Sequence, residues 1–287
     1  MDKERIDNEK NKGQSHKELP GKHIFMLGAI KSPKSKKDYV FESRIFAGGA
    51  DAMPAALDLR GELPPIRDQG VQGSCVAQSA ACVKEYHEHI DVNKLNEHMS
   101  PQFIYNHRSN FPKDGMFGRD VMDILLKYGC PLEKTFTYGG LNANKSANEI
   151  PASVKEEAQN FIIKAYARVG FNNGDNDGNI YNLKKSIKDN GPCVALFPVY
   201  SYSSEFWNKV GNQEILGGHA VAIIGWNESG FIIRNSWGVF WGQNGYSIYK
   251  FGDFISPKHW EIWTAVDAQS KVIVKPIPTP GCKCSIL

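Results

Sequence analysis

The run from Ile66 to Ser79, IRDQGVQGSCVAQS, holds a cysteine in a setting that suits nucleophilic chemistry. Cys75 follows Ser74, a residue type that commonly caps a helix N-terminus, and the apolar residues that follow recur at helical spacing. A thiol attacks a carbonyl as its thiolate, and both a helix N-terminus and an adjacent imidazolium lower its pKa. Because free cysteines are often inert core residues, Cys75 is a candidate nucleophile only if a base lies near it.

Among the eight histidines, His219 is the best placed to be that base. It follows two glycines and opens an apolar run typical of a strand, so we expect its ring at the edge of a sheet. A catalytic imidazole also needs a group that holds the correct tautomer. Asn235 lies 16 residues later on the next predicted strand, where a hairpin would place it beside His219. Trp237 would then cover their hydrogen bond. The competing interpretations are an ordinary turn residue for Asn235 and a core residue for Trp237, and both would have to hold by accident in the right order.

Two periodicities in the chain predict where these residues lie. Residues 56 to about 151 favour helices, chiefly 75–89 and 119–129, the second of which ends at a glycine. The following half changes to short β-branched or aromatic runs separated by glycine-bearing turns, at 193–199, 219–226, 231–237 and 245–251. The sequence therefore predicts an α+β fold in which the nucleophile belongs to the helical half and the base to a mostly antiparallel sheet.

Composition excludes several other classes of protein. The 287 residues are 41% hydrophobic and 23% charged, as expected of a soluble globular chain, and residues 1–40 contribute more positive charge than the whole net charge of +3. The nearly neutral body argues against a nucleic-acid partner. We find no signal peptide and no apolar run of the roughly 20 residues that a membrane span needs. The six cysteines lack metal-ligand or dense disulfide spacing, so we expect reduced thiols, no metal and no cofactor.

Three blocks of the sequence resemble the papain and cathepsin family of cysteine proteases. They read DQGVQGSCVAQS, GGHAVAIIGW and IIRNSWGVFWGQNGYSIY, and the resemblance spans residues 56–266. His219 lies 144 residues after Cys75 and Asn235 lies 160 after it, against about 130 to 150 in the family, so we expect an insertion between the halves. The resemblance implies a two-lobed papain-like domain over residues 53–270. Its helical left lobe would cover about 60–155, its antiparallel β-sheet or barrel right lobe about 156–270, and its active site the cleft between them.

The resemblance also implies a role for each candidate residue. Cys75 would attack the scissile carbonyl of a protein or peptide, and His219 would hold the thiolate as an ion pair before protonating the leaving amine. Asn235 would orient the imidazole, supported by Trp237, while the Gln69 amide and the Cys75 backbone N–H would bind the oxyanion. The expected function is that of a monomeric cysteine endopeptidase working through an acyl-enzyme. The alternative is a papain-like scaffold used for binding or for acyl transfer to an amine.

The substrate-binding residues are inferred from position in the family pattern. The run DGMFGRD resembles the family's cleft loop, so the Gly115 backbone would pair with substrate and Phe117 would line a pocket. Gly218, directly before the catalytic histidine, would contribute its carbonyl. A turn explains both glycines equally well.

Three positions depart from the family pattern. Val76 stands where the residue after the nucleophile is usually tryptophan, and Gln78 replaces an aromatic residue. These two changes concern the packing of the wall of the site and leave its chemistry unaffected. Gln72 stands where a disulfide cysteine is usual, which agrees with a reducing compartment.

The two ends of the chain carry separate signals. Residues 1–52 form an extension similar to the short N-terminal region of compact microbial papain-like enzymes, and we hypothesise that this pro-region passes over the cleft and restrains activity. Residues 271–287 form a Pro-rich tail that ends in CSIL, a prenylation pattern for Cys284, with Cys282 available as a second acylation site. The sequence thus predicts an intracellular protein that is cytosolic or anchored to a membrane through a prenylated C-terminus.

Overall fold

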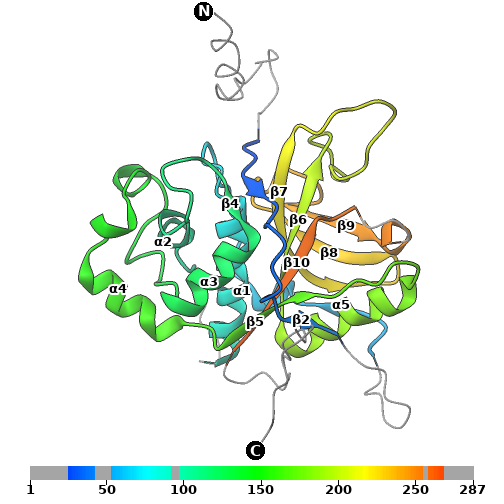
Figure 1. The fold of residues 1–287 in the computed structure, drawn as a ribbon, viewed down its shortest axis with the longest axis horizontal. Helices are drawn as coiled ribbons and strands as arrows, with labels where there is room; N and C mark the ends of the chain where they lie inside the picture. The colour runs from blue at the N-terminus through cyan, green and yellow to red at the C-terminus, as the bar shows by residue number, and fades with distance from the viewer. Residues whose placement is uncertain (1–24, 43–52, 92–96, 255–257, 268–287) are drawn as a thin grey trace, which may run out of the picture.

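The computed structural model describes residues 25–42, 53–91, 97–254 and 258–267, and it has two lobes (Figure 1). Helices gather on one side and strands on the other, with α1 (Cys75–Asp91) between them. This arrangement confirms the predicted α+β fold with a helical and a sheet lobe. It also places the N-terminus of α1, where Cys75 lies, at the boundary between the lobes.

The helical lobe is built around α1 by three further helices. They are α2 (Pro101–Asn106), α3 (Gly118–Lys127) and α4 (Ala152–Ala158). Helix α1 is buried along most of its length because it packs against α2 and α3 on one side and against the sheet on the other. The predicted helices at 75–89 and 119–129 are therefore present, each with ends shifted by one or two residues.

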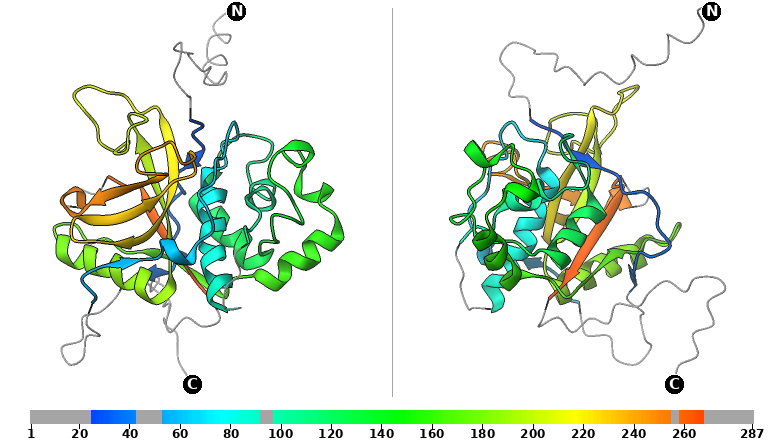
Figure 2. Two further views of the ribbon diagram at one scale, coloured as in Figure 1. Left: turned by 180° about the vertical axis from the view of Figure 1, so that it is seen from behind. Right: turned by 60° about the vertical axis from the view of Figure 1, so that its left-hand side comes forward.

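The second lobe is a twisted sheet in the order β2-β5-β10-β6-β7-β8-β9, with β3 paired to β7. Its strands are β2 (Val40–Phe41), β3 (Leu57–Asp58), β5 (Ala165–Val169), β6 (Cys193–Val199), β7 (Gly217–Trp226), β8 (Gly230–Arg234), β9 (Tyr246–Lys250) and β10 (Glu261–Val266). All neighbours are antiparallel except β2 and β5, which confirms the mostly antiparallel prediction. Helix α5 (Asn176–Asn190) packs against this sheet through a buried stripe that includes Leu183 and Ile187 (Figures 1 and 2).

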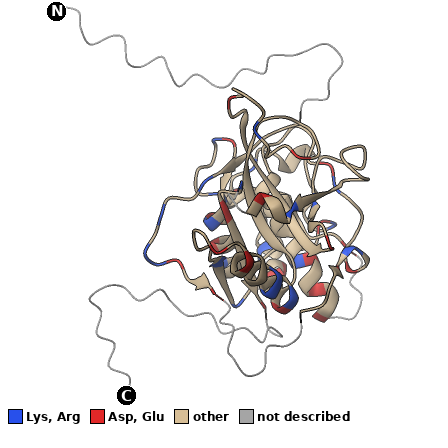
Figure 3. Ribbon diagram, turned by 90° about the vertical axis from the view of Figure 1, so that its right-hand side faces the viewer, with Lys and Arg blue, Asp and Glu red and all other residues tan. Residues whose placement is uncertain are grey.

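Five short 3-10 turns complete the described elements. They are η1 (Arg60–Glu62), η2 (Gly140–Asn142), η3 (Ala147–Glu149), η4 (Gln159–Phe161) and η5 (Phe251–Phe254). Acidic and basic residues are interspersed along the ribbon in Figure 3. In the described part of the chain, every helix is too short or too polar to cross a bilayer.

The described part of the N-terminal extension, residues 25–42, runs between the two lobes (Figure 2). Its strand β1 (Ala29–Ile30) pairs in parallel with β4 (Met116–Phe117) of the helical lobe. Further on, β2 joins the edge of the sheet in parallel with β5. The extension therefore bridges the lobes along the line where the active site was predicted.

Candidate active site

Cys75 is the first residue of α1 and is fully buried. Ser74 precedes the helix as predicted, but its hydroxyl lies 2.5 Å from the Tyr138 hydroxyl, and its backbone carbonyl accepts from the N–H of Gln78. The thiol thus lies at the positive end of a helix of 17 residues, which favours a thiolate.

His219 and Asn235 meet through the β7–β8 hairpin, as the sequence predicts. His219 lies on β7, and Asn235 directly follows β8, which ends at Arg234. The Nε2 atom of His219 donates to Oδ1 of Asn235 at 2.7 Å, and the backbone N–H of Ser236 donates to the same oxygen. Trp237 stacks on the imidazole at a centroid distance of 4.0 Å and so shields this hydrogen bond.

The hydrogen bond to Asn235 also determines which nitrogen of His219 is the base. A carboxamide oxygen only accepts, so the proton lies on Nε2 and the lone pair on Nδ1. Nδ1 is buried and has no hydrogen-bond partner within the described residues. The Cys75 thiol faces the backbone of Ala220, the residue next to His219 in β7.

Burial keeps both reacting groups neutral in this structure. Desolvation raises the pKa of the Cys75 thiol to about 11, although the backbones of Ala220 and Gly28 oppose the rise. Desolvation also lowers the pKa of His219 to about 3, against the opposing effect of the Asn235 hydrogen bond. An ion pair of thiolate and imidazolium is therefore disfavoured as long as the site stays covered.

Gln69 presents its amide nitrogen to the cleft. Its Oε1 accepts from the Ser236 hydroxyl at 2.7 Å, which leaves Nε2 to donate to the carbonyls of Gln72 at 2.9 Å and Met26 at 3.2 Å. The Tyr138 hydroxyl donates to the Gln69 backbone carbonyl at 2.8 Å. The Gln69 amide, which the sequence predicts to bind the oxyanion, thus donates in this structure to a carbonyl of the N-terminal extension.

Sequence reasoning missed two residues that hold this arrangement. Ser236 lies inside the NSW run, so its position beside Asn235 was a usable signal for a role in the site. Tyr138 contacts Ser74 from 64 residues away, and nothing in the local pattern indicates that contact.

Residues 25–30 form a segment that lies along the residues predicted to bind substrate. The N–H of Gly28 donates to the Gly218 carbonyl at 3.0 Å, and the Gly28 carbonyl accepts from the Met116 N–H at 2.8 Å. Ile30 is in register with Phe117. Gly115 lies one residue before Met116, which pairs with the segment. Its φ is +82°, and a Cβ on Gly115 would lie 2.8 Å from the Gly28 carbonyl oxygen.

The other end of the segment reaches the aromatic residues around His219. Phe25 stacks on Trp237 with a centroid distance of 4.7 Å and an interplanar angle of 12°, and it contacts Tyr202 at 5.9 Å. Phe206 contacts the edge of the His219 ring from within the sheet lobe. The covering segment therefore buries Trp237 and, through it, the hydrogen bond between His219 and Asn235.

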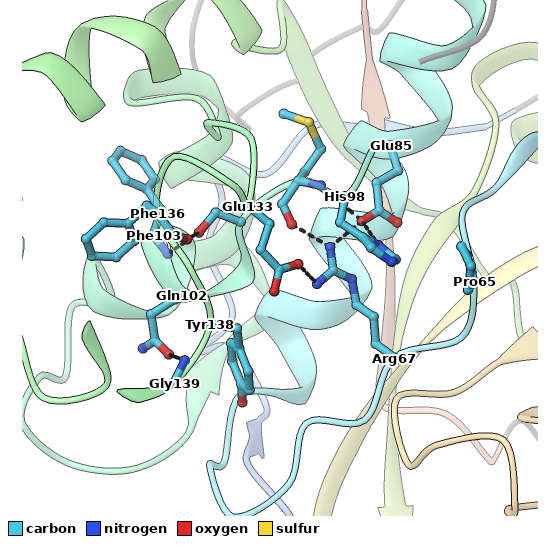
Figure 4. A network of polar contacts seen from close by, with 12 residues as sticks. Pro65, Arg67, Glu85, His98, Gln102, Phe103, Glu133, Phe136, Tyr138 and Gly139 are labelled. Atoms are coloured by element: carbon cyan, nitrogen blue, oxygen red, sulfur yellow. Dashed lines mark hydrogen bonds and ion pairs between the residues drawn. The ribbon is translucent and has the colours of Figure 1, made fainter. Parts of the chain in front are cut away.

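A buried ion network fixes the chain that leads to Gln69 (Figure 4). Arg67 lies 2.6 Å from a carboxylate oxygen of Glu85 on α1 and also pairs with Glu133. Burial alone would raise the pKa of Glu85, but Arg67 and then His98 lower it to about 2. These contacts join α1 to two loops of the helical lobe, so the position of Gln69 depends on a charged cluster that stays ionised at neutral pH.

The structure also accounts for one departure from the family pattern. Gln72 exchanges two amide hydrogen bonds with Gln102 of α2, at 2.9 and 3.1 Å. The four described cysteines, at positions 75, 82, 130 and 193, are free and buried. A pair of amides thus ties this loop to the helical lobe at the position where a disulfide cysteine is usual.

One group of carboxylates could bind a metal by geometry. Ligand atoms of Glu88, Asp91 and Asp267 lie within 4.8 Å of one another. The Lys84 ammonium already lies 2.6 Å from Glu88 and 2.8 Å from Asp267. This cluster therefore has a cation of its own, and we assign it no metal. Cys282 and Cys284 lie outside the described residues.

The class of thiol-dependent hydrolases is defined by a small set of side chains. It comprises a thiol on a helix, a histidine on a sheet that is oriented by an asparagine, and a glutamine amide at the oxyanion position. The model of the family described as "Papain family cysteine protease" matches residues 53–256. The chain therefore belongs to the papain family of cysteine proteases.

Relatives and solved structures agree with this family. A peptidase C1-like protein of Acanthamoeba polyphaga mimivirus is 34% identical over 196 residues, covering 62% of each chain. Papain of Carica papaya is 27% identical over 205 residues, covering 70% of this chain and 56% of papain's own. This chain thus spans less than two thirds of the length of these relatives. The crystal structure of xylellain, a cysteine protease from Xylella fastidiosa, superposes with a TM-score of 0.71 and 25% identity, covering 88% of this chain and 99% of that one.

Proposed function

We propose that this chain is a cysteine endopeptidase in a latent form, with Cys75 as nucleophile and residues 25–42 as the segment that holds it inactive. The observation that carries the proposal is the His219–Asn235 hydrogen bond of 2.7 Å, because it leaves Nδ1 as the basic nitrogen of a histidine whose neighbour in β7, Ala220, has its backbone against the Cys75 thiol. The intact set of Cys75, His219, Asn235 and Gln69 favours catalysis over a scaffold used only for binding.

In the proposed reaction His219 Nδ1 takes the proton of the Cys75 thiol, and the sulfur attacks the scissile carbonyl carbon. Gln69 Nε2 and the Cys75 backbone N–H donate to the oxygen that becomes negative. His219 then gives its proton to the leaving amine as the C–N bond breaks. Water, deprotonated by the same imidazole, attacks the thioester and releases the acid, which restores the thiol.

The latency proposal rests on three kinds of contact. The segment places its Met26 carbonyl on the Gln69 amide, and its Gly28 backbone bonds to both walls of the cleft. Arg119 binds Asp38 through two hydrogen bonds of 2.6 Å, which secure the segment further along. Substrate cannot reach Cys75 until these contacts are broken.

The test displaces the segment in the full-length chain. A Cβ on Gly28 would lie 1.9 Å from the Gly73 carbonyl oxygen, a backbone atom that cannot move aside easily, so Gly28→Ala should force the segment out of the cleft. We expect this variant to react with an epoxide inhibitor of cysteine proteases and to hydrolyse casein at least tenfold faster than the parent chain. Gly61→Ala is the matched control, because a Cβ there meets nothing within 4 Å.

Three results would count against the proposal. Labelling that persists when Cys75→Ala is added to Gly28→Ala would mean that another residue is the nucleophile. Equal hydrolysis by the parent chain and the Gly28→Ala variant would remove the restraining role of the segment. Failure to label at all would favour the binding scaffold.

We further propose that the protein works as an intracellular monomer and that Cys284 is prenylated, with Cys282 as a second acylation site. The support is the CSIL ending on a Pro-rich tail. Intact mass spectrometry of the protein from a eukaryotic cell, alone and as Cys284→Ser, tests this. We expect the mass of an isoprenoid on the parent only, and an unmodified parent would end the proposal.

A further inference from the structure

A buried carboxylate beyond Ile30 accepts hydrogen bonds from the covering segment. Glu261 opens β10 beside the start of α3 (Figure 1) and is only 5% exposed. One of its oxygens accepts from both the N–H and the hydroxyl of Ser32, at 3.1 and 2.8 Å. Both donors belong to the segment, so its departure removes the hydrogen bonds that satisfy this carboxylate.

The surroundings of Glu261 favour a negative charge that faces the cleft. A Cβ on Gly118, the first residue of α3, would lie 2.5 Å from its Oε1 and 2.8 Å from the indole nitrogen of Trp263. The Trp263 N–H is buried and has no hydrogen-bond partner within the described residues. An unpartnered donor and a helix N-terminus both stabilise an anion. In the latent chain the charge of Arg119 also interacts favourably with Glu261. A buried carboxylate of this kind favours a cationic partner.

The part of the cleft next to Glu261 is occupied by a small side chain. Ala29 is 6% exposed and packs in an apolar cluster with Met116, Ala220 and Leu196, and Trp260 borders the same cluster. Apart from the hydrogen of glycine, a methyl group is the smallest side chain that this position can hold. A longer side chain entering past these apolar walls would bury its methylenes there and bring its end toward Glu261.

We infer that Glu261 is a specificity-determining residue that selects substrates with a lysine or arginine side chain in the part of the peptide that binds along β4. This inference rests on the proposed peptidase function. The same carboxylate thus has two successive partners, Ser32 in the latent chain and a basic substrate side chain after release.

Arg119 interacts electrostatically with Glu261 and could compete with a basic substrate side chain for this role. In the latent chain it is held by Asp38 and by the Pro33 carbonyl at 2.6 Å, and its backbone N–H donates to the Ser32 hydroxyl. Release of the segment frees the guanidinium of Arg119 from these contacts. The test must therefore distinguish two states of the opened chain. In one, Glu261 is free to bind a basic substrate side chain; in the other, Arg119 pairs with Glu261.

The experiment uses the full-length Gly28→Ala chain, with Asp38→Asn as the opening variant if Gly28→Ala does not fold. Fluorogenic peptides carry either arginine or its neutral isostere citrulline at the second or third residue before the scissile bond. We expect kcat/KM to be at least tenfold higher for arginine at one of these positions. Glu261→Gln, which keeps an acceptor for Ser32, should abolish the preference, and Glu205→Gln, a surface carboxylate paired with Lys250, should retain it.

Binding provides a readout that does not depend on turnover. In a Gly28→Ala, Cys75→Ala chain, the arginine peptide should bind at least tenfold more tightly than the citrulline peptide, and Glu261→Gln should make the two equal. Equal binding and equal kcat/KM with Glu261 intact would overturn the inference while leaving the peptidase proposal standing. A preference that appears only after Arg119→Gln would also overturn it. Selective binding without any hydrolysis would support the selectivity and contradict the peptidase proposal.

Discussion

The Ser236 hydroxyl donates to Oε1 of Gln69 at 2.7 Å, and this hydrogen bond determines which end of the Gln69 amide faces the cleft. Both atoms are buried, so the amide would lose a partner if it rotated. The residue beside Asn235 thereby orients the amide that we propose as the oxyanion donor.

Ser236→Ala should therefore lower kcat about tenfold with little change in KM. The expected loss is smaller than the 10²- to 10³-fold cost of deleting an oxyanion donor, because the Gln69 amide stays present but less well oriented. Kinetics on a fluorogenic peptide in the Gly28→Ala background measure it, with the exposed Ser229→Ala as control. A raised KM with unchanged kcat would place Ser236 outside the oxyanion site.

The pH dependence of thiol alkylation should differ between the latent and opened chains. Burial raises the pKa of Cys75 to about 11, so in the parent chain the thiolate fraction is small at neutral pH and rises with pH toward that value. In the Gly28→Ala chain solvent enters, the ion pair with His219 can form, and alkylation should be fast and nearly flat from pH 6 to 8. Iodoacetamide rates across this range test the difference, and identical profiles would show that the segment does not control the thiol.

Acid should destabilise the fold between pH 7 and 5 through buried histidines. Desolvation lowers the pKa of His259 and His219 to about 3 and that of His87 to about 4. The unfolded chain takes up protons below the ordinary value near 6.5 while the folded chain does not, so this stability is present above that pH and is lost as pH falls. Each group contributes up to about 1.4 kcal/mol per pH unit to the slope.

His259→Asn isolates one of these contributions. His259 lies between the rings of Phe171 and Tyr249 in the sheet lobe, away from the catalytic contacts. Urea unfolding of the variant at pH 7 and pH 5 should show a smaller loss of stability between the two pH values than the parent does. An unchanged difference would mean that His259 does not carry the acid sensitivity.

Asp38→Asn should make Cys75 of the latent chain more accessible to a labelling reagent. It removes the charge from a carboxylate that is 6% exposed and bonded twice to Arg119, which weakens the attachment of the segment without a steric clash. We expect several-fold faster epoxide labelling of Cys75 than in the parent chain. Glu42→Gln, an exposed carboxylate four residues further along, serves as control, and equal labelling of Asp38→Asn and parent would exclude this ion pair from latency.

Local sequence was enough to predict the elements that carry the catalytic residues. The β-branched run at 193–199 matches β6 at both ends, and the 219–226 run is the body of β7. The predicted strand 231–237 ends early, at Arg234, because Asn235 turns to bond His219. Strands β1 and β4 have two residues each and gave no periodic signal, since each exists only through pairing with the other.

Sequence by itself determined which residues would do the chemistry. The identities and order of Cys75, His219 and Asn235, on a helix start and a strand hairpin, follow from short-range pattern and turn chemistry. Tertiary structure alone decided that the site is closed and that Met116, one residue beyond Gly115, pairs with the segment. Only the folded chain brings Ser32 to Glu261, 229 residues away. Contacts of this kind depend on how two lobes pack around one helix, and no local periodicity records that packing.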